Sequence, residues 1–118
     1  MEQAARQERL DGYTFKVSID EDNKYYLIIN EQNGEPFEVF IRSDDPAIYQ
    51  WVNACTVLIT RMLRAGISLS VIAGELQEIH SAGTSLHFTP NGKQCHSIVA
   101  RIGQVFEQYL KQRGEAAA

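Results

Sequence analysis

The first third of the chain alternates apolar and polar side chains. Residues 13–19 carry an apolar side chain at every second position, which is the period of a half-buried β-strand. Residues 25–30 are apolar on both faces, which predicts a central strand. Asn33 and Gly34 tolerate positive φ and predict a hairpin turn before a third strand over residues 37–41. The pattern predicts a three-stranded antiparallel meander.

The apolar period changes to about 3.6 residues after this meander, which predicts a helix. Asp45 suits the N-cap, Pro46 the first helical position and Gly66 the end of the helix. The predicted inward-facing stripe comprises Ile48, Trp51, Val52, Cys55, Leu58, Ile59 and Met62. Packed against Phe15 and Val17 of the first strand, this stripe is expected to form the core.

Two further helices follow. Ser68 is the predicted N-cap of a short helix whose inward face runs to Ile79, and residues 81–95 are loop-like with a short extended piece at 86–88. A last helix carries one apolar side, comprising Ile98, Ile102, Val105, Phe106, Tyr109 and Leu110. The predicted fold class is α+β, with the meander packed against two or three helices.

The predicted organisation is one domain over residues 12–112, after a flexible lead-in at residues 1–11 and before a disordered tail at residues 113–118. A chain of 118 residues has room for one hydrophobic core without disulfides or metals.

Composition narrows the function classes. The net charge of −4 argues against direct nucleic-acid binding, because phosphate recognition needs a basic face. No apolar run approaches the ~20 residues of a membrane span, and the first nine residues lack a signal-peptide core. Cys55 and Cys95 are far apart and form no CxxC pair. Two reduced thiols in a cytoplasmic protein are expected.

No complete catalytic or metal-binding constellation is visible. His80, His87 and His96 have no second ligand at i+3 or i+4, so neither a metal site nor a cofactor is expected. Cys95 beside His96 at a helix start could form an activated thiol, but a catalytic cysteine also needs an orienting base and an oxyanion hole. An ordinary loop cysteine is favoured, and no residue is assigned a catalytic role.

Two regions are candidates for binding a nucleotide or a partner. Backbone N–H groups at the start of the last helix favour phosphate, although an ordinary turn and cap explain the same residues. Glu38 lies in the third strand and points opposite Phe37 and Val39. If that face is covered, Glu38 needs a partner such as Lys16, but a solvated face is favoured. The candidate residues are Lys16, Glu38, Gly92, Lys93, His96, Ser97 and Arg101.

The order of several runs along the chain carries a family resemblance. The runs are residues 10–17 (LDGYTFKV), 25–30 (YYLIIN), 34–41 (GEPFEVFI), 63–66 (LRAG), 75–76 (EL) and 97–107 (SIVARIGQVFE). Together they resemble the TSCPD-type domain that occurs at the C-terminal end of vitamin B12-dependent ribonucleotide reductases and as short separate proteins of bacteria and their viruses. The resemblance covers residues 10–110.

The chain departs from that family pattern in two ways. His96 stands where family members often have a proline, and the cysteine motif that gives the domain its name is absent. A zinc or thiol role of those cysteines therefore does not carry over to this chain.

The resemblance implies a non-catalytic accessory or regulatory module that binds a reductase subunit or a nucleotide. The alternative is a small acidic viral protein that inhibits or sequesters a host factor, such as a defence protein or a nucleic-acid enzyme. A weaker option is an enzyme centred on Cys95 and His96. An open sheet edge near Tyr13 invites pairing, which makes a homodimer a candidate assembly.

Overall fold

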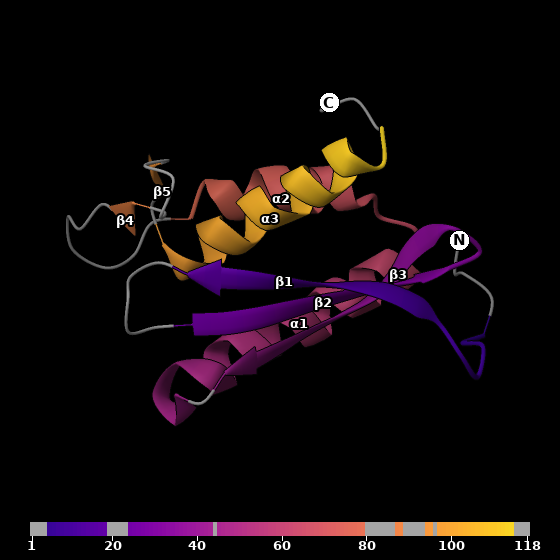
Figure 1. Ribbon diagram of the computed structural model, residues 1–118, viewed down its shortest axis with the longest axis horizontal. Coiled ribbons are helices and arrows are strands. Elements are labelled where there is room, and N and C mark those ends of the chain that lie inside the picture. The colour runs from indigo at the N-terminus through magenta and orange to yellow at the C-terminus, as the bar shows by residue number, and fades with distance from the viewer. Residues whose placement is uncertain are drawn as a thin grey trace. The chain divides into compact units, whose positions relative to one another are not determined.

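The computed structural model describes residues 5–18, 24–43, 45–79, 87–88, 94–95 and 97–114. Its elements are β1 (Asp11–Ser18), β2 (Lys24–Gln32), β3 (Glu35–Ser43), α1 (Pro46–Arg64), α2 (Leu69–Gln77), β4 (His87–Phe88), β5 (Gln94–Cys95) and α3 (Ile98–Gln112) (Figure 1). The predicted α+β class is confirmed. The loop residues 80–86 and 89–93, and residues 115–118 of the predicted tail, lie outside the described residues.

The chain divides into two compact units, which are considered separately. The first comprises Met1–Lys16 and Tyr25–Ser68, and the second Val17–Lys24 and Leu69–Ala118. The prediction of a single domain over residues 12–112 stays a prediction.

The three long strands form the predicted meander in the order β1-β2-β3, so the doubly apolar β2 is central, as expected. β2 and β3 pair antiparallel. Asn33 and Gly34 form the hairpin turn with φ values of 56° and 78°, the left-handed conformation that a two-residue type I′ loop requires. A register shift between Asn30 and Glu31 interrupts the ladder.

The two faces of the β2–β3 hairpin differ in burial. One face is buried and consists of Tyr25, Leu27, Ile29, Phe37, Val39 and Ile41. Because successive side chains of a strand point to opposite faces, the intervening residues lie on the other face, where Tyr26 and Phe40 are exposed. This second face of the sheet is referred to below as the outer face.

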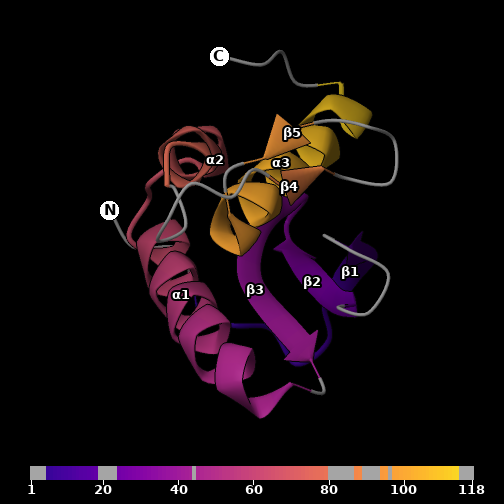
Figure 2. The same ribbon diagram turned by 90° about the vertical axis from the view of Figure 1, so that its left-hand side faces the viewer.

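Helix α1 lies alongside β3 (Figure 2). The Thr60 hydroxyl accepts a hydrogen bond from the Val39 amide at 2.9 Å and donates one to the Val39 carbonyl at 3.1 Å. Since β2 occupies the other side of β3, these two bonds satisfy backbone groups on the free edge of the sheet. The Arg64 guanidinium covers the Phe37 ring at 4.8 Å.

The ends of α1 agree with the sequence. The Tyr49 amide bonds to the Asp45 carbonyl at 2.8 Å, so the helix starts at Pro46 as predicted. At the other end Gly66 has φ 93°, and the amides of Gly66 and Ile67 bond back to the carbonyls of Leu63 and Met62. These two bonds form a Schellman motif.

The predicted inward stripe of α1 is partly wrong. The buried side chains are Val52, Thr56, Ile59 and Leu63, whereas Trp51 is 73% and Leu58 63% exposed. Thr56 can be buried because its hydroxyl donates a hydrogen bond to the Asn53 carbonyl at 3.0 Å. The side that faces β3 therefore lies about 100° around the helix from the side that carries Trp51.

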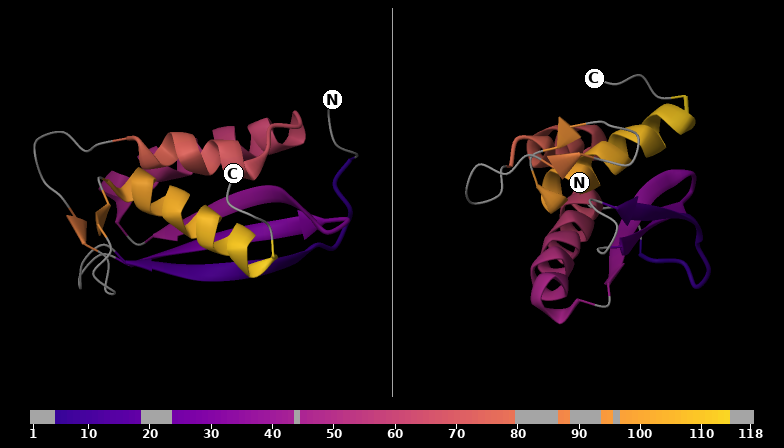
Figure 3. Two further views of the ribbon diagram at one scale, coloured as in Figure 1. Left: turned by 90° about the horizontal axis from the view of Figure 1, so that it is seen from above. Right: turned by 60° about the vertical axis from the view of Figure 1, so that its left-hand side comes forward.

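In the second unit α2 and α3 lie side by side (Figures 1 and 3). Gly103 allows this close approach, because a Cβ at that position would lie 2.8 Å from the Ala73 carbonyl oxygen. The predicted apolar side of α3 is confirmed from Ile102 to Leu110. Ile79, predicted to face inward, is exposed, because α2 already ends at Gln77.

Candidate functional site

Glu38 is buried, and the expectation of a solvated strand face is wrong. Only 6% of its side chain is exposed, and the Arg6 Nη2 lies 3.0 Å from its Oε1. The Arg6 Nε also donates to the carboxylate, at 3.1 Å to Oε2, and the Asn30 amide donates to Oε1 at 3.0 Å. The partner is thus Arg6 from the N-terminal segment, where the sequence had suggested Lys16.

The electrostatics of Glu38 follow from these contacts. Burial raises the pKa of Glu38, whereas the hydrogen bonds from Arg6 and Asn30 lower it. The lowering effects together are larger, so the pKa lies below its usual value. The same pairing raises the pKa of Arg6. With both oxygens engaged, Glu38 acts as a structural anchor for the N-terminal segment.

A second contact holds the same segment. The Gln7 amide donates to the Gln32 side-chain oxygen at 2.7 Å, and the Gln32 amide nitrogen donates to the Ala5 carbonyl at 3.1 Å. Residues 5–7 are therefore hydrogen-bonded to the β2–β3 hairpin. Lys16 is exposed on β1, and its role in binding stays a prediction.

Ser97, one of the predicted binding residues, has a structural role at the start of α3. Ser97 is the N-cap of α3 and its hydroxyl accepts a hydrogen bond from the Ala100 amide at 2.9 Å. The same hydroxyl donates to the Ile79 carbonyl at 2.6 Å. Arg101 lies on the first turn of α3 and bonds to Gln104 at 3.3 Å. Gly92, Lys93 and His96 lie outside the described residues, so the predicted anion site stays a prediction.

The cysteines are placed differently from one another. Cys55 lies on α1, where burial raises the pKa of its thiol, so the thiol is protonated and a poor nucleophile at neutral pH. Cys95 belongs to β5 and pairs in register with His87 of β4. His96 lies outside the described residues, so an activated Cys95 stays a prediction. Among the described residues, no group of three His, Cys, Asp or Glu side chains could hold a metal ion.

Helix α1 carries a second apolar row that sequence reasoning placed in the core. We call it the α1 strip, and it consists of Trp51, Cys55, Leu58 and Met62. Its spacing of four, three and four residues repeats that of the buried row at Val52, which is the spacing of a helix docking seam. Trp51 and Leu58 are largely exposed, and Cys55 and Met62 are half-buried. Exposed apolar surface is common where proteins bind one another.

The α1 strip and the Arg6–Glu38 pair differ in how far the sequence predicts them. The spacing of the α1 strip can be read from the sequence, but α1 carries two rows with this spacing, and the spacing does not indicate which of them is buried. The Arg6–Glu38 pair had no signal, because the two residues are 32 positions apart and the N-terminal segment has no periodic pattern.

The comparisons with known proteins identify a family. A family model described as the TSCPD domain matches residues 2–110. Neither the curated proteins nor the solved structures contain a match. Since the matched residues are nearly the whole chain, the chain belongs to the TSCPD domain family, as the sequence resemblance indicated. TSCPD domains are associated with ribonucleotide reductases. In the described part of the chain, no helix is both long and apolar enough to cross a membrane.

Proposed function

We propose that this TSCPD domain is a non-catalytic accessory or regulatory module that binds a subunit of a ribonucleotide reductase. The α1 strip is the observation that carries the proposal, because a row of exposed apolar side chains on one helix is suited to receiving a protein partner. The association of the family with reductases supplies the class of partner.

The α1 strip has the composition of an affinity-determining contact. Trp51 is the only tryptophan of the chain and is 73% exposed, and tryptophan is among the residues most enriched in binding hot spots. Burial of ~150 Å² of indole surface would contribute roughly 4 kcal/mol at ~25 cal/mol per Å². Association also has an entropic cost, so Trp51 needs the neighbouring Leu58 to give a stable complex.

Charge around the α1 strip restricts the partner further. From residue 46 to residue 74 the sequence contains no Asp or Glu, and its charged residues are Arg61 and Arg64. Arg64 covers the Phe37 ring, so Arg61 is the cation nearer the strip, and this suits a partner whose apolar surface has an acidic rim. The alternative role, a small acidic inhibitor of a host factor, stays a prediction from the net charge, and this cationic helix does not favour it.

The test uses Trp51 as a reporter. Fluorotryptophan incorporated at Trp51 gives a single fluorine NMR signal, because the chain has one tryptophan, and purified unlabelled reductase subunits are then titrated in. We expect the signal to shift on binding of one subunit. Leu58→Ser should weaken that binding by about tenfold or more, since a fully buried leucine contributes ~1.5–3 kcal/mol.

The matched control is Ile79→Ser, which removes an exposed apolar side chain from the second unit and should leave the affinity unchanged. The proposal would be refuted if no subunit shifts the signal. It would equally be refuted if Leu58→Ser and Ile79→Ser bind as tightly as the unmodified chain.

A further inference from the structure

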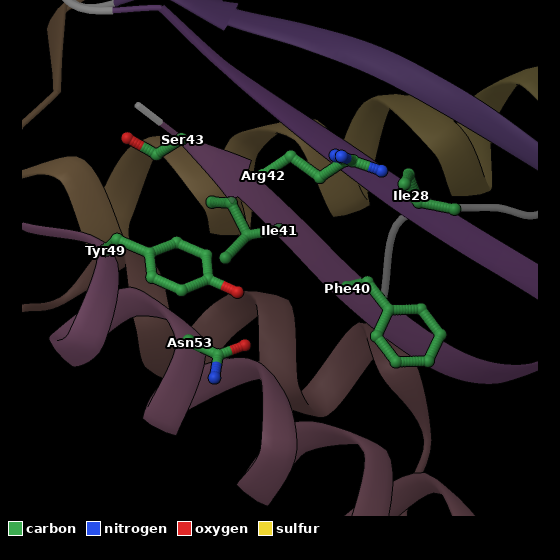
Figure 4. Close-up of a pocket in the computed structure, with 7 residues that line it drawn as sticks. All are labelled: Ile28, Phe40, Ile41, Arg42, Ser43, Tyr49 and Asn53. Atoms are coloured by element: carbon green, nitrogen blue, oxygen red, sulfur yellow. The ribbon is translucent and has the colours of Figure 1, made fainter. Parts of the chain in front are cut away.

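A hollow of about 470 Å³ lies between the C-terminal half of β3 and the first turns of α1 (Figure 4). All of its lining residues belong to the first unit. This volume is within the range of ~300–1,000 Å³ in which proteins bind small molecules. The hollow does not include the α1 strip, so it is a separate feature of the surface.

Three polar side chains line the hollow. They are the Arg42 guanidinium, the Tyr49 hydroxyl and the Asn53 amide. None of these groups has a hydrogen bond or ion pair with another described residue. Figure 4 shows Tyr49 and Asn53 projecting from α1 and Arg42 extending from β3 toward Ile28. All three groups can donate hydrogen bonds to a ligand.

The remaining lining groups favour an anion that carries a flat ring. Phe40 on the outer face is 46% exposed, and an exposed aromatic ring is a stacking surface for a nucleobase. Ile28, its cross-strand neighbour, extends this apolar patch. The described lining contains no carboxylate, and α1 has no acidic side chain in its first turn. Arg42 is thus the charged group of the lining.

We infer that this hollow binds a nucleoside phosphate. Arg42 holds the phosphate with charge-assisted hydrogen bonds from its planar guanidinium, and Phe40 stacks on the base. Asn53 offers the paired donor and acceptor that match the edge of a base, and the Tyr49 hydroxyl is within the same lining to bond the sugar or the phosphate. The inference uses a surface other than the proposed reductase contact and can be tested separately.

Calorimetric titration of the full chain with ADP, CDP, GDP and UDP tests the inference. Adenosine and inorganic pyrophosphate serve as half-ligands. We expect at least one nucleoside diphosphate to bind, and each half-ligand to bind at least about tenfold more weakly, because each makes only the stacking or the ionic contact.

Two variants locate the binding. Arg42→Gln should lower the affinity by about tenfold or more and flatten its dependence on salt, because it removes the ionic contact. Arg61→Gln is the matched control: it removes an exposed arginine of α1 that does not line the hollow, and it should leave the affinity unchanged. Amide NMR shifts on ADP addition should concentrate at Phe40, Tyr49 and Asn53.

Three outcomes would overturn the inference. These are the absence of binding by all four nucleoside diphosphates, equal losses in Arg42→Gln and Arg61→Gln, or NMR shifts that lie away from the hollow. If Leu58→Ser loses reductase binding but still binds ADP, the two proposed sites bind their ligands independently.

Discussion

The contact between α2 and α3 makes a sharp prediction, because two glycines on facing helices differ in the space around them. A Cβ added to Gly103 of α3 would lie 2.8 Å from the Ala73 carbonyl oxygen and 3.0 Å from side-chain atoms of Leu76 and Gln77. Gly74 of α2 has nothing within 4 Å of that position. The same substitution, Gly→Ala, should therefore have opposite effects at the two sites.

The magnitudes follow from two terms. Alanine is better than glycine in a helix interior by about 1 kcal/mol, and this gain applies to both positions. At Gly103 the new methyl meets a backbone carbonyl, which cannot rotate away, so the helices must separate. Overpacking of this kind costs about 1–3 kcal/mol. Gly74→Ala should stabilise the chain by up to about 1 kcal/mol, and Gly103→Ala should destabilise it by up to about 2 kcal/mol.

Urea unfolding of the two variants and the unmodified chain measures both terms. With a slope of ~1–3 kcal/mol per M, the midpoints of the two variants should differ by about 1 M. The packing argument is refuted if Gly103→Ala unfolds at the same or a higher urea concentration than Gly74→Ala.

Three further predictions concern single contacts. Thr60→Val removes both hydrogen bonds to the backbone of Val39 and should lower the free energy of unfolding in urea by about 1–3 kcal/mol; an unchanged midpoint would contradict the edge contact. Ser97→Ala removes the hydroxyl that caps α3 and donates to the Ile79 carbonyl and should cost about 1–2 kcal/mol in a thermal melt, whereas Ser97→Thr keeps a hydroxyl and should retain most of the stability. The pKa of Glu38 is lowered in the folded chain, so its stabilisation is present above its unfolded pKa and lost as the pH falls through its folded pKa. Urea midpoints measured down a pH series should show this loss below the usual value of 4.5, and Arg6→Gln should reduce it; an equal slope in both would contradict the pairing.

The strands and the hairpin turn were predictable from the sequence because their determinants are local. Alternation over residues 13–17 sets which side chains share a face, and Asn33-Gly34 supplies the positive φ values of the turn. β2 was correctly predicted to be central, because consecutive strands joined by short turns pair with one another; its outer face is not covered, since Tyr26 is 44% exposed. The ends of α1 were similarly local.

The orientation of α1 was decided by tertiary structure. Val52 and Ile59 repeat at the same spacing as Trp51 and Leu58, so helical periodicity alone does not distinguish the two rows. In the structure the Val52 row is buried, and the hydroxyl of Thr60 bonds the free edge of β3 at Val39. Because the Val52 row is buried, Trp51 lies on the surface as part of the α1 strip.

The environments of Glu38 and of the hollow also depend on segments far apart along the chain. Arg6 reaches Glu38 across 32 positions, and Arg42 shares the hollow with Tyr49 and Asn53 only because α1 lies beside β3. The sequence by itself determined the three long strands, the three helices and the family, because these depend on neighbouring residues, whereas β5 lies in a segment predicted as loop. Only the tertiary structure decided which apolar row is buried and which polar side chains line the hollow, because both depend on which elements pack together.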